Sequence, residues 1–446
     1  MLTHRLSRPA RRIIAAGASA AALALALSAC SSGGGSSSAS KSQDPNEKIT
    51  LTVATFNQFG YTQELFDQYT KEHPNVTIKQ EVAATSDDAK ANFTTKLAAG
   101  GAGLADIQAV DIDWMPTVLQ YEDKFSDLSD ASVKGRWLDW KTKQATAPDG
   151  KLLGYGTDIG PMAICYRQDL FQKYGLPSDP ASVAKLLGGK DATWDKYFSV
   201  GEDFVKASHG KVGWYDSPDG TYQAMVGQLA NPYENSDGTP KDLSSNADIK
   251  ALFEKVATES KDKGLSAHNQ EWQPDWTSSF QKDAFATMAC PPWMTASIKT
   301  NSGGVKGWNI ADVFPGGGGN WGGSFLVVPA TGKHTAAAKD FANWLTAPDQ
   351  QISAYKQASN FPSQVEAEKN PVVADSKNDF FNNAPVGTIF ANRAAAVTVT
   401  PFKGPNYFTI NKAVTDALVA YDVQGKGSVD SNWNAAVGAY KALGLG

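Results

Sequence analysis

Cysteine and histidine are scarce in this chain, and their scarcity limits the chemistry that it can support. The 446 residues include three cysteines and five histidines, and the histidines do not show the spacing of a metal-binding motif. The glycine run at 316–319 lacks the lysine and the serine or threonine of a phosphate-binding loop. We therefore expect no bound metal and no cofactor.

An excess of positive charge is also missing. Lysine and arginine total 41 against 46 acidic residues, and the formal net charge is −5. Such a balance does not favour nucleic acid or an anionic membrane surface as a partner. After the amino-terminal segment, no apolar run approaches the 18 residues of a membrane span, so we expect the rest of the chain to be soluble.

Residues 1–29 have the layout of a bacterial export signal. Arginines precede a leucine and alanine run that is too short for a stable membrane span, and no acidic residue occurs before Cys30. The small residues that end at Ala29, placed directly against Cys30, resemble the lipobox of bacterial lipoproteins. That resemblance implies cleavage before Cys30 and lipid attachment of its thiol, which would anchor the protein at the outer face of the cell membrane. The alternative is an ordinary secretory signal with an incidental cysteine.

Serine and glycine dominate the next segment, so we expect residues 30–47 to form a flexible tether. About 400 residues follow, enough for two domains of ordinary size. Cys165 and Cys290 remain in this part. Outside the cytoplasm they could form a disulfide, and the alternative is two separate buried thiols.

Strands and helices alternate at the start of the folded part, which predicts an α/β fold. The expected order is a strand ending at Phe56, a helix capped by Thr62, a strand at 75–82, a helix around Phe93 and a strand at 105–111. This order predicts a parallel sheet with helices on its faces. Ligands of such folds bind beyond the carboxyl ends of the strands, and the loops there are rich in aromatic, carboxylate and amide side chains.

Four later segments carry a family resemblance through their order along the chain. They are "DLFQKYGLP" (169–177), "SFQKDAFATMACPPW" (279–293), "GGSFLVVPATGKHTAAAKDFANWLTAPDQQ" (322–351) and "SNFPS" (359–363). Together they resemble the extracellular solute-binding proteins of carbohydrate ABC transporters, the maltose-binding-protein-like group. Within that group "GYGTDIGPMAICYRQDLF" (154–171) is similar to actinobacterial binding proteins for cellobiose and cello-oligosaccharides.

The resemblance implies a two-lobed periplasmic-binding-protein-like fold, with lobes joined by hinge crossings and a ligand cleft between them. We expect crossings near Thr157, Ser324 and Glu366. The closed protein would be a monomer that delivers its oligosaccharide to ABC permease subunits in the membrane. The expected lobes are 48–157 with 325–366, and 158–324 with 367–446.

A sugar site needs aromatic faces for the C–H surfaces of the rings and polar side chains for the hydroxyls. Residue type, loop position and the resemblance together predict twelve ligand contacts: Asn57, Gln58, Phe59, Asp111, Asp113, Trp114, Asp158, Trp272, Trp293, Trp321, Asn406 and Tyr407. For the rings the alternative is core packing. For the polar residues it is turn or capping chemistry, and for Asp158 a hinge aspartate bonded to backbone amides.

Several other functions compete with a cello-oligosaccharide importer. Xylo-oligosaccharides and α-glucosides are alternative ligands. A secreted glycoside hydrolase would need a pair of carboxylates, for which Asp111, Asp113 and Asp158 are available. A peptide-binding protein would want a fixed arginine, which the expected cleft loops lack. An adhesion lipoprotein that presents its aromatic residues to a polymer is a further alternative. We expect a binding protein and not an enzyme.

Overall fold

The structure is a computed structural model that describes residues 47–445. The predicted lipidation site Cys30 and nearly all of the predicted tether lie outside the described residues. Within them, no helix combines the length and apolar character needed to cross a bilayer. The described residues form one compact unit.

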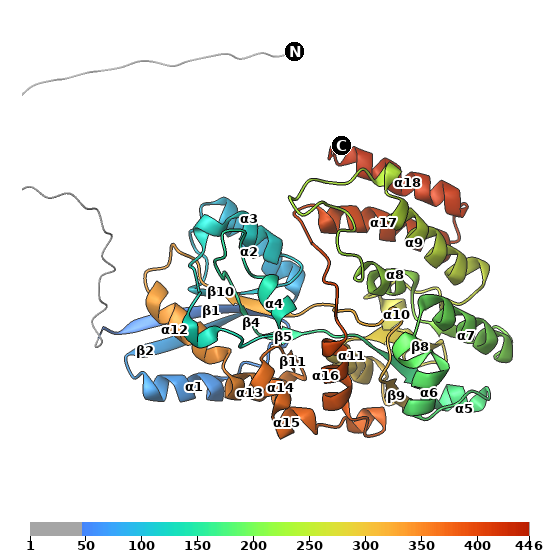
Figure 1. Ribbon diagram of the computed structural model, residues 1–446, viewed down its shortest axis with the longest axis horizontal. Coiled ribbons are helices and arrows are strands. Elements are labelled where there is room, and N and C mark those ends of the chain that lie inside the picture. The colour runs from blue at the N-terminus through green and yellow to red at the C-terminus, as the bar shows by residue number, and fades with distance from the viewer. Residues whose placement is uncertain (1–46, 446) are drawn as a thin grey trace, which may run out of the picture. The chain divides into compact units, whose positions relative to one another are not determined.

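A five-stranded sheet has the order β2-β1-β3-β10-β4. Its strands are β1 (Ile49–Phe56), β2 (Val76–Ala83), β3 (Ile107–Asp111), β4 (Tyr155–Gly156) and β10 (Ser324–Val327). The first three strands are parallel, as predicted. The prediction of a parallel sheet is wrong for the part of the sheet that contains β10 and β4, because β10 runs antiparallel to both β3 and β4. β10 does not follow a crossover helix of this sheet but returns from the second sheet (Figure 1).

Local signals explain the helices of this part. Helix α1 (Gln63–Glu72) begins where the Thr62 hydroxyl accepts a hydrogen bond of 3.3 Å from the amide of Leu65. Its buried residues include Leu65 and Tyr69, which lie on one face at helical spacing. Both the cap and the face agree with the sequence prediction. Helix α2 (Ser86–Ala98) covers the sheet with Phe93 and Leu97.

A four-stranded sheet has the order β7-β8-β6-β9. Its strands are β6 (Ala163–Arg167), β7 (Gly213–Tyr215), β8 (Phe285–Cys290) and β9 (Trp308–Ala311). Strand β6 is antiparallel to β8 and to β9. Cys165 and Cys290 are joined by a disulfide, with 5.4 Å between their Cα atoms, so the open choice between a bridge and separate thiols is resolved in favour of the bridge.

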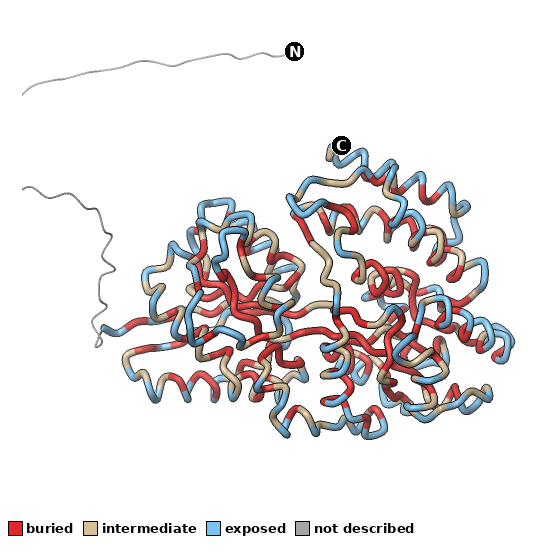
Figure 2. Tube along the Cα trace, viewed as in Figure 1, coloured by how far each residue is buried: buried red, intermediate tan, exposed pale blue. Residues whose placement is uncertain are grey.

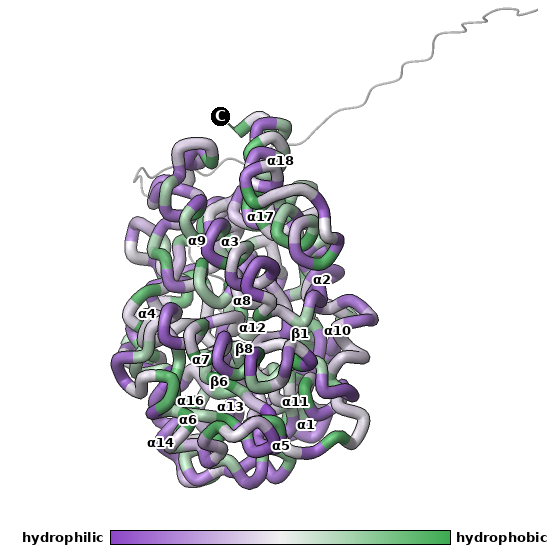
Figure 3. Tube along the Cα trace, turned by 90° about the vertical axis from the view of Figure 1, so that its right-hand side faces the viewer, coloured by the Kyte–Doolittle hydropathy of each residue, from purple (hydrophilic) through white to green (hydrophobic). Residues whose placement is uncertain are grey.

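Both faces of this second sheet are buried. Ile164 and Tyr166 of β6 point into one core cluster, and Ala163 and Cys165 into another, as strand alternation requires. In Figure 2 the strands are accordingly among the most continuously buried segments. The surrounding helices change in hydropathy along their length in Figure 3, which is typical of helices with one face on a core.

The chain passes between the two sheets three times. The first passage is β5 (Asp158–Ile159), between β4 and β6, and the second is residues 312–323, between β9 and β10. The third is β11 (Phe361–Pro362), which pairs antiparallel with β5. Phe361 packs in the same core cluster as residues of the second sheet. The chain therefore contacts that sheet five residues before the expected crossing at Glu366. The lobe boundaries themselves stay a prediction.

Helices complete the second part of the chain. They are α5 (Gln168–Lys173), α6 (Pro180–Leu186), α7 (Trp194–Ala207), α8 (Pro218–Val226), α9 (Ala247–Ala257), α10 (Pro274–Ser279), α11 (Pro292–Asn301), α16 (Val386–Ala395), α17 (Tyr407–Asp422) and α18 (Val429–Ala442). Between β10 and β11 lie α12 (Thr335–Leu345) and α13 (Pro348–Ala358). Helix α12 packs on the first sheet through Phe341 and Leu345.

Candidate functional site

Two carboxylates follow the carboxyl end of β3. Asp111 is the last residue of the strand and pairs with Ser324 of β10. Its Oδ1 accepts a hydrogen bond of 2.9 Å from the amide of Asp113. Burial, and then the neighbouring charge of Asp113, raise the pKa of Asp111 to about 8.

A lysine from the far end of the chain pairs with the second carboxylate. Lys403 lies just before α17, and its Nζ forms an ion pair with Oδ1 of Asp113. The Lys403 side chain is 6% exposed, and that of Asp113 is 28% exposed. Burial opposes the charged form of Lys403, but Asp113 outweighs it, and the pKa of the ammonium group is raised. This contact was missed because nothing in the sequence links positions 113 and 403.

The predicted contact Asp158 ties together two of the passages between the sheets. Its Oδ1 accepts hydrogen bonds of 2.8 Å from the Thr157 hydroxyl and 2.9 Å from the Ser324 amide. This is the bonding of a hinge aspartate, which was the alternative to ligand contact.

A buried lysine faces the same passages. Lys141 is 1% exposed, and its Nζ lies 3.6 Å from the ring centroid of Phe325. Within the described residues that Nζ has no hydrogen-bond partner. Burial lowers the pKa of Lys141 to about 7, and the charges of Asp158 and Asp111 offset only part of that effect.

Three of the predicted tryptophans form one aromatic group, which we call the tryptophan cluster: Trp272, Trp293 and Trp321. The rings of Trp293 and Trp321 meet edge to face at 5.6 Å, and the Trp293 Nε1 donates a hydrogen bond of 2.9 Å to the Trp321 carbonyl oxygen. The Trp272 ring stacks on Trp293 at 6.0 Å and is 54% exposed. Trp276 also contacts Trp272, at 5.0 Å, and the cluster leaves more than half of the Trp272 surface exposed to solvent.

Other predicted contacts lie in the core of the described structure. The side chains of Phe59, Trp114 and Tyr407 are 9%, 3% and 0% exposed. Trp114 packs between Phe56 and Phe93, with ring separations of 5.8 and 5.2 Å. Core packing, the alternative for these rings, is what the structure shows. Their contact with a ligand stays a prediction.

The predicted amides lie in two different settings. Asn57 and Gln58 are exposed in the loop after β1, where Asn57 has a φ of 50° and the Gln58 carbonyl accepts a hydrogen bond of 3.0 Å from Asn360. Asn406 instead donates from Nδ2 to Oε1 of Glu234 at 3.1 Å. Asn57 and Gln58 therefore remain available to a ligand, whereas Asn406 already has a protein partner.

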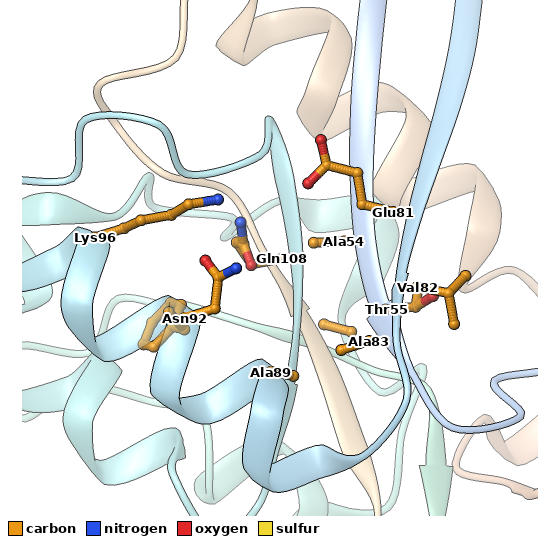
Figure 4. A pocket seen from close by; sticks show the side chains of 11 residues that line it. Ala54, Thr55, Glu81, Val82, Ala83, Ala89, Asn92, Lys96 and Gln108 are labelled. Carbon is orange, nitrogen blue, oxygen red and sulfur yellow. The ribbon is translucent and has the colours of Figure 1, made fainter.

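A separate cavity of about 150 Å³ lies between α2 and the strands β1, β2 and β3 (Figure 4). Its lining includes Gln108, Asn92 and Lys96, and the Gln108 residue is 5% exposed. None of the predicted ligand contacts lines this cavity. Elsewhere in the described part of the chain, no group of three or more histidine, cysteine or acidic side chains could hold a metal ion.

Comparison with known proteins decides the family. The family model of bacterial extracellular solute-binding proteins matches residues 64–382. This chain belongs to that family. A crystal structure described as an extracellular solute-binding protein of family 1 is 45% identical, with a TM-score of 0.82, and the match covers 88% of this chain and 99% of that one. The family consists of binding proteins and not of enzymes.

More distant relatives share the fold. The galacto-N-biose/lacto-N-biose I-binding protein of a Bifidobacterium longum ABC transporter is 17% identical, with a TM-score of 0.70 over 90% of this chain and 98% of its own. A protein of Brucella abortus (strain 2308), named "Putative binding protein BAB2_0491", is 24% identical over 268 residues, 58% of this chain. The match spans 61% of the length of that curated relative. The solved structures establish the two-lobed solute-binding fold for this chain.

Proposed function

We propose that this chain is the oligosaccharide-binding protein of an ABC importer, with cello-oligosaccharides as its ligands. In this proposal the sugar binds between two lobes, one built on each sheet, and the closed protein delivers it to the membrane permease. A lipid on Cys30 would keep the protein at the outer face of the membrane as a monomer.

The class of ligand is supported by what distant relatives bind. Structures of the same fold hold lacto-N-biose, β-1,6-galactobiose and maltose, in proteins 15–17% identical to this chain. The finer choice of cello-oligosaccharides depends on the resemblance of residues 154–171 to cellobiose-binding proteins. Xylo-oligosaccharides and α-glucosides are therefore the comparison ligands.

The tryptophan cluster is the observation that carries the proposal. The C–H faces of a pyranose pack on aromatic rings, and the exposed part of the Trp272 ring supplies such a surface. Asp111 and Asp113, at the end of β3, add carboxyl groups that can form hydrogen bonds with hydroxyls. Together they match the two kinds of surface that a sugar presents.

The first experiment is a titration of the chain from residue 41 onward, which retains every described residue. Cellobiose, cellotriose, xylotriose and maltotriose are added in turn while heat and tryptophan fluorescence are followed. Saturable binding of the cello series without hydrolysis is the expected result. Binding of another series would overturn the choice of cello-oligosaccharides, and release of reducing sugar would favour the hydrolase. If none of the four binds, the cello-oligosaccharide proposal fails and a wider screen follows, beginning with peptides.

A pair of variants separates the cluster from general surface effects. Trp272→Ala should weaken binding about tenfold, equivalent to about 1.4 kcal/mol. Tyr121→Ala is the matched control, because Tyr121 is also an exposed aromatic residue, at 45% exposed, but lies outside the cluster. Equal effects of the two variants would contradict the assignment of Trp272 to the site.

A further inference from the structure

The cavity between α2 and the first sheet contains a buried polar side chain that has no partner in the protein. Gln108 of β3 lines this cavity and is 5% exposed. Within residues 47–445 its carboxamide forms no hydrogen bond with another residue. A carboxamide offers both donors and acceptors, and burying them without partners costs free energy. This side chain therefore indicates a polar occupant of the cavity.

The strand register brings an acidic side chain to the same face of the sheet. Ala54 of β1 pairs with Gln108 on one side and with Glu81 of β2 on the other. Residues paired in this way have side chains on the same face. Because the methyl group of Ala54 is small, it leaves space between the two longer side chains, and all three residues line the cavity. Glu81 is exposed, so the space is open to solvent on this side.

Helix α2 contributes the remaining polar groups. Asn92 and Lys96 are four residues apart, so they lie on one face of the helix, and both line the cavity. In Figure 4 their side chains point toward Gln108, and Glu81 points toward them from β2. Glu81 and Lys96 do not form an ion pair with each other, and in the described part of the chain neither has another charged partner.

The size of the cavity and the two opposite charges limit what can bind there. Its volume of about 150 Å³ equals that of an engineered protein cavity that binds benzene. The Lys96 ammonium suits a carboxylate, Glu81 suits an ammonium group, and the two carboxamides suit either. A neutral polyol would leave both charges without a counter-charge, and a simple anion would be repelled by Glu81.

We infer that this cavity is a second binding site, for a small zwitterionic α-amino acid whose carboxylate pairs with Lys96 and whose ammonium group pairs with Glu81. The Gln108 carboxamide is the buried hydrogen-bonding partner that orients the ligand. None of the predicted sugar contacts lines the cavity, so the site is separate from the proposed sugar site. The inference goes beyond the proposed function and does not depend on it.

The test uses four compounds that each have as many non-hydrogen atoms as benzene: L-alanine, L-lactate, L-alaninamide and glycerol. Isothermal titration calorimetry measures the Kd of each at neutral pH, with the same protein as in the sugar titration. L-Alanine should bind saturably. Lactate lacks the ammonium group and alaninamide lacks the carboxylate, so each should bind at least about tenfold more weakly through the loss of a charge-assisted hydrogen bond. Glycerol should bind more weakly still.

Variants show whether L-alanine binds in this cavity. Glu81→Gln should raise the Kd of L-alanine at least about tenfold without weakening lactate, whereas Lys96→Met should weaken both. Gln108→Leu removes the buried carboxamide and should also weaken L-alanine. Glu64→Gln is the matched control, because Glu64 is an exposed glutamate of α1 that does not line the cavity.

Several results would overturn the inference. One is the absence of saturable L-alanine binding to wild type, and another is an equal effect of Glu81→Gln and Glu64→Gln. Lactate or glycerol binding as tightly as L-alanine would indicate an anion or polyol site and would overturn the zwitterionic class. Where Gln108→Leu does not fold, Glu81→Gln and Lys96→Met decide, because neither of these side chains is buried. A failed sugar titration affects none of these results, since no sugar is used.

Discussion

Replacement of the buried Lys141 by methionine should stabilise the protein at neutral pH. Burial lowers the pKa of this lysine from the usual 10.5 to about 7. At about 1.4 kcal/mol per pH unit, the cost of keeping it in the fold is at most about 5 kcal/mol. The methionine keeps the apolar stem but loses the attraction to the Phe325 ring, which offsets about 2 kcal/mol. We therefore expect a net gain of about 2–3 kcal/mol in the free energy of unfolding at about pH 7.

The pH dependence of this gain is the sharper test. Because the folded-state pKa is lower than the unfolded one, the unfolded chain binds more protons between about pH 7 and pH 10.5. The lysine penalty is therefore complete below about pH 7 and disappears as the pH rises through about 10.5. Urea denaturation of wild type and Lys141→Met across this range measures the difference, which should shrink toward zero at the alkaline end. A variant that is less stable at neutral pH, with a difference that does not change with pH, would refute the reasoning.

Three further predictions concern the contacts that hold the two sheets. Asp113→Asn should lower the free energy of unfolding by about 3 kcal/mol, because it leaves the deeply buried ammonium group of Lys403 unpaired. Lys403→Met should lower it by only about 1–2 kcal/mol, because the carboxylate that it leaves unpaired is partly exposed. Urea denaturation measures both values. Replacement of Cys165 and Cys290 by alanine should lower the free energy of unfolding by about 2–4 kcal/mol, and equal midpoints before and after reduction would contradict this. Gly160→Ala should cost more than about 4 kcal/mol, because its Cβ would lie 1.7 Å from a carbonyl oxygen of the facing passage; an unchanged thermal midpoint would disprove it.

The sequence allowed prediction of those elements whose signals are local. Strand β1 and helix α1 were predicted because alternation, a threonine cap and an apolar stripe all lie within a few residues. The antiparallel direction of β10 could not be predicted, because it depends on the route by which the chain returns from the other sheet. The ion pair of Lys403 with Asp113 likewise depends on tertiary proximity alone.

The candidate site divides in the same way. Residue type and loop position led to the tryptophan cluster, because exposed tryptophans beside proline and glycine are poor core residues. They could not separate Trp272 from Trp114, since both follow an acidic residue in a loop. Phe56 and Phe93 help to bury Trp114, which is 3% exposed, whereas Trp272 contacts the rings of Trp276 and Trp293 and still stays 54% exposed. Such enclosure is decided by residues from other elements.

The place of β10 between β3 and β4 in the first sheet has a consequence for how the chain reaches its native state. β4 is hydrogen-bonded within that sheet only to β10, and β10 follows all four strands of the second sheet along the chain. During synthesis the first sheet therefore stays incomplete, with an open strand edge, until almost three quarters of the chain has emerged. Pairings between such distant segments are slow to form, because the entropy of closing a long loop is lost before the contacts compensate for it. Strands β1, β2 and β3 lie within residues 49–111 and can pair early, whereas the addition of β10 and β4 to that sheet should be a late step of folding.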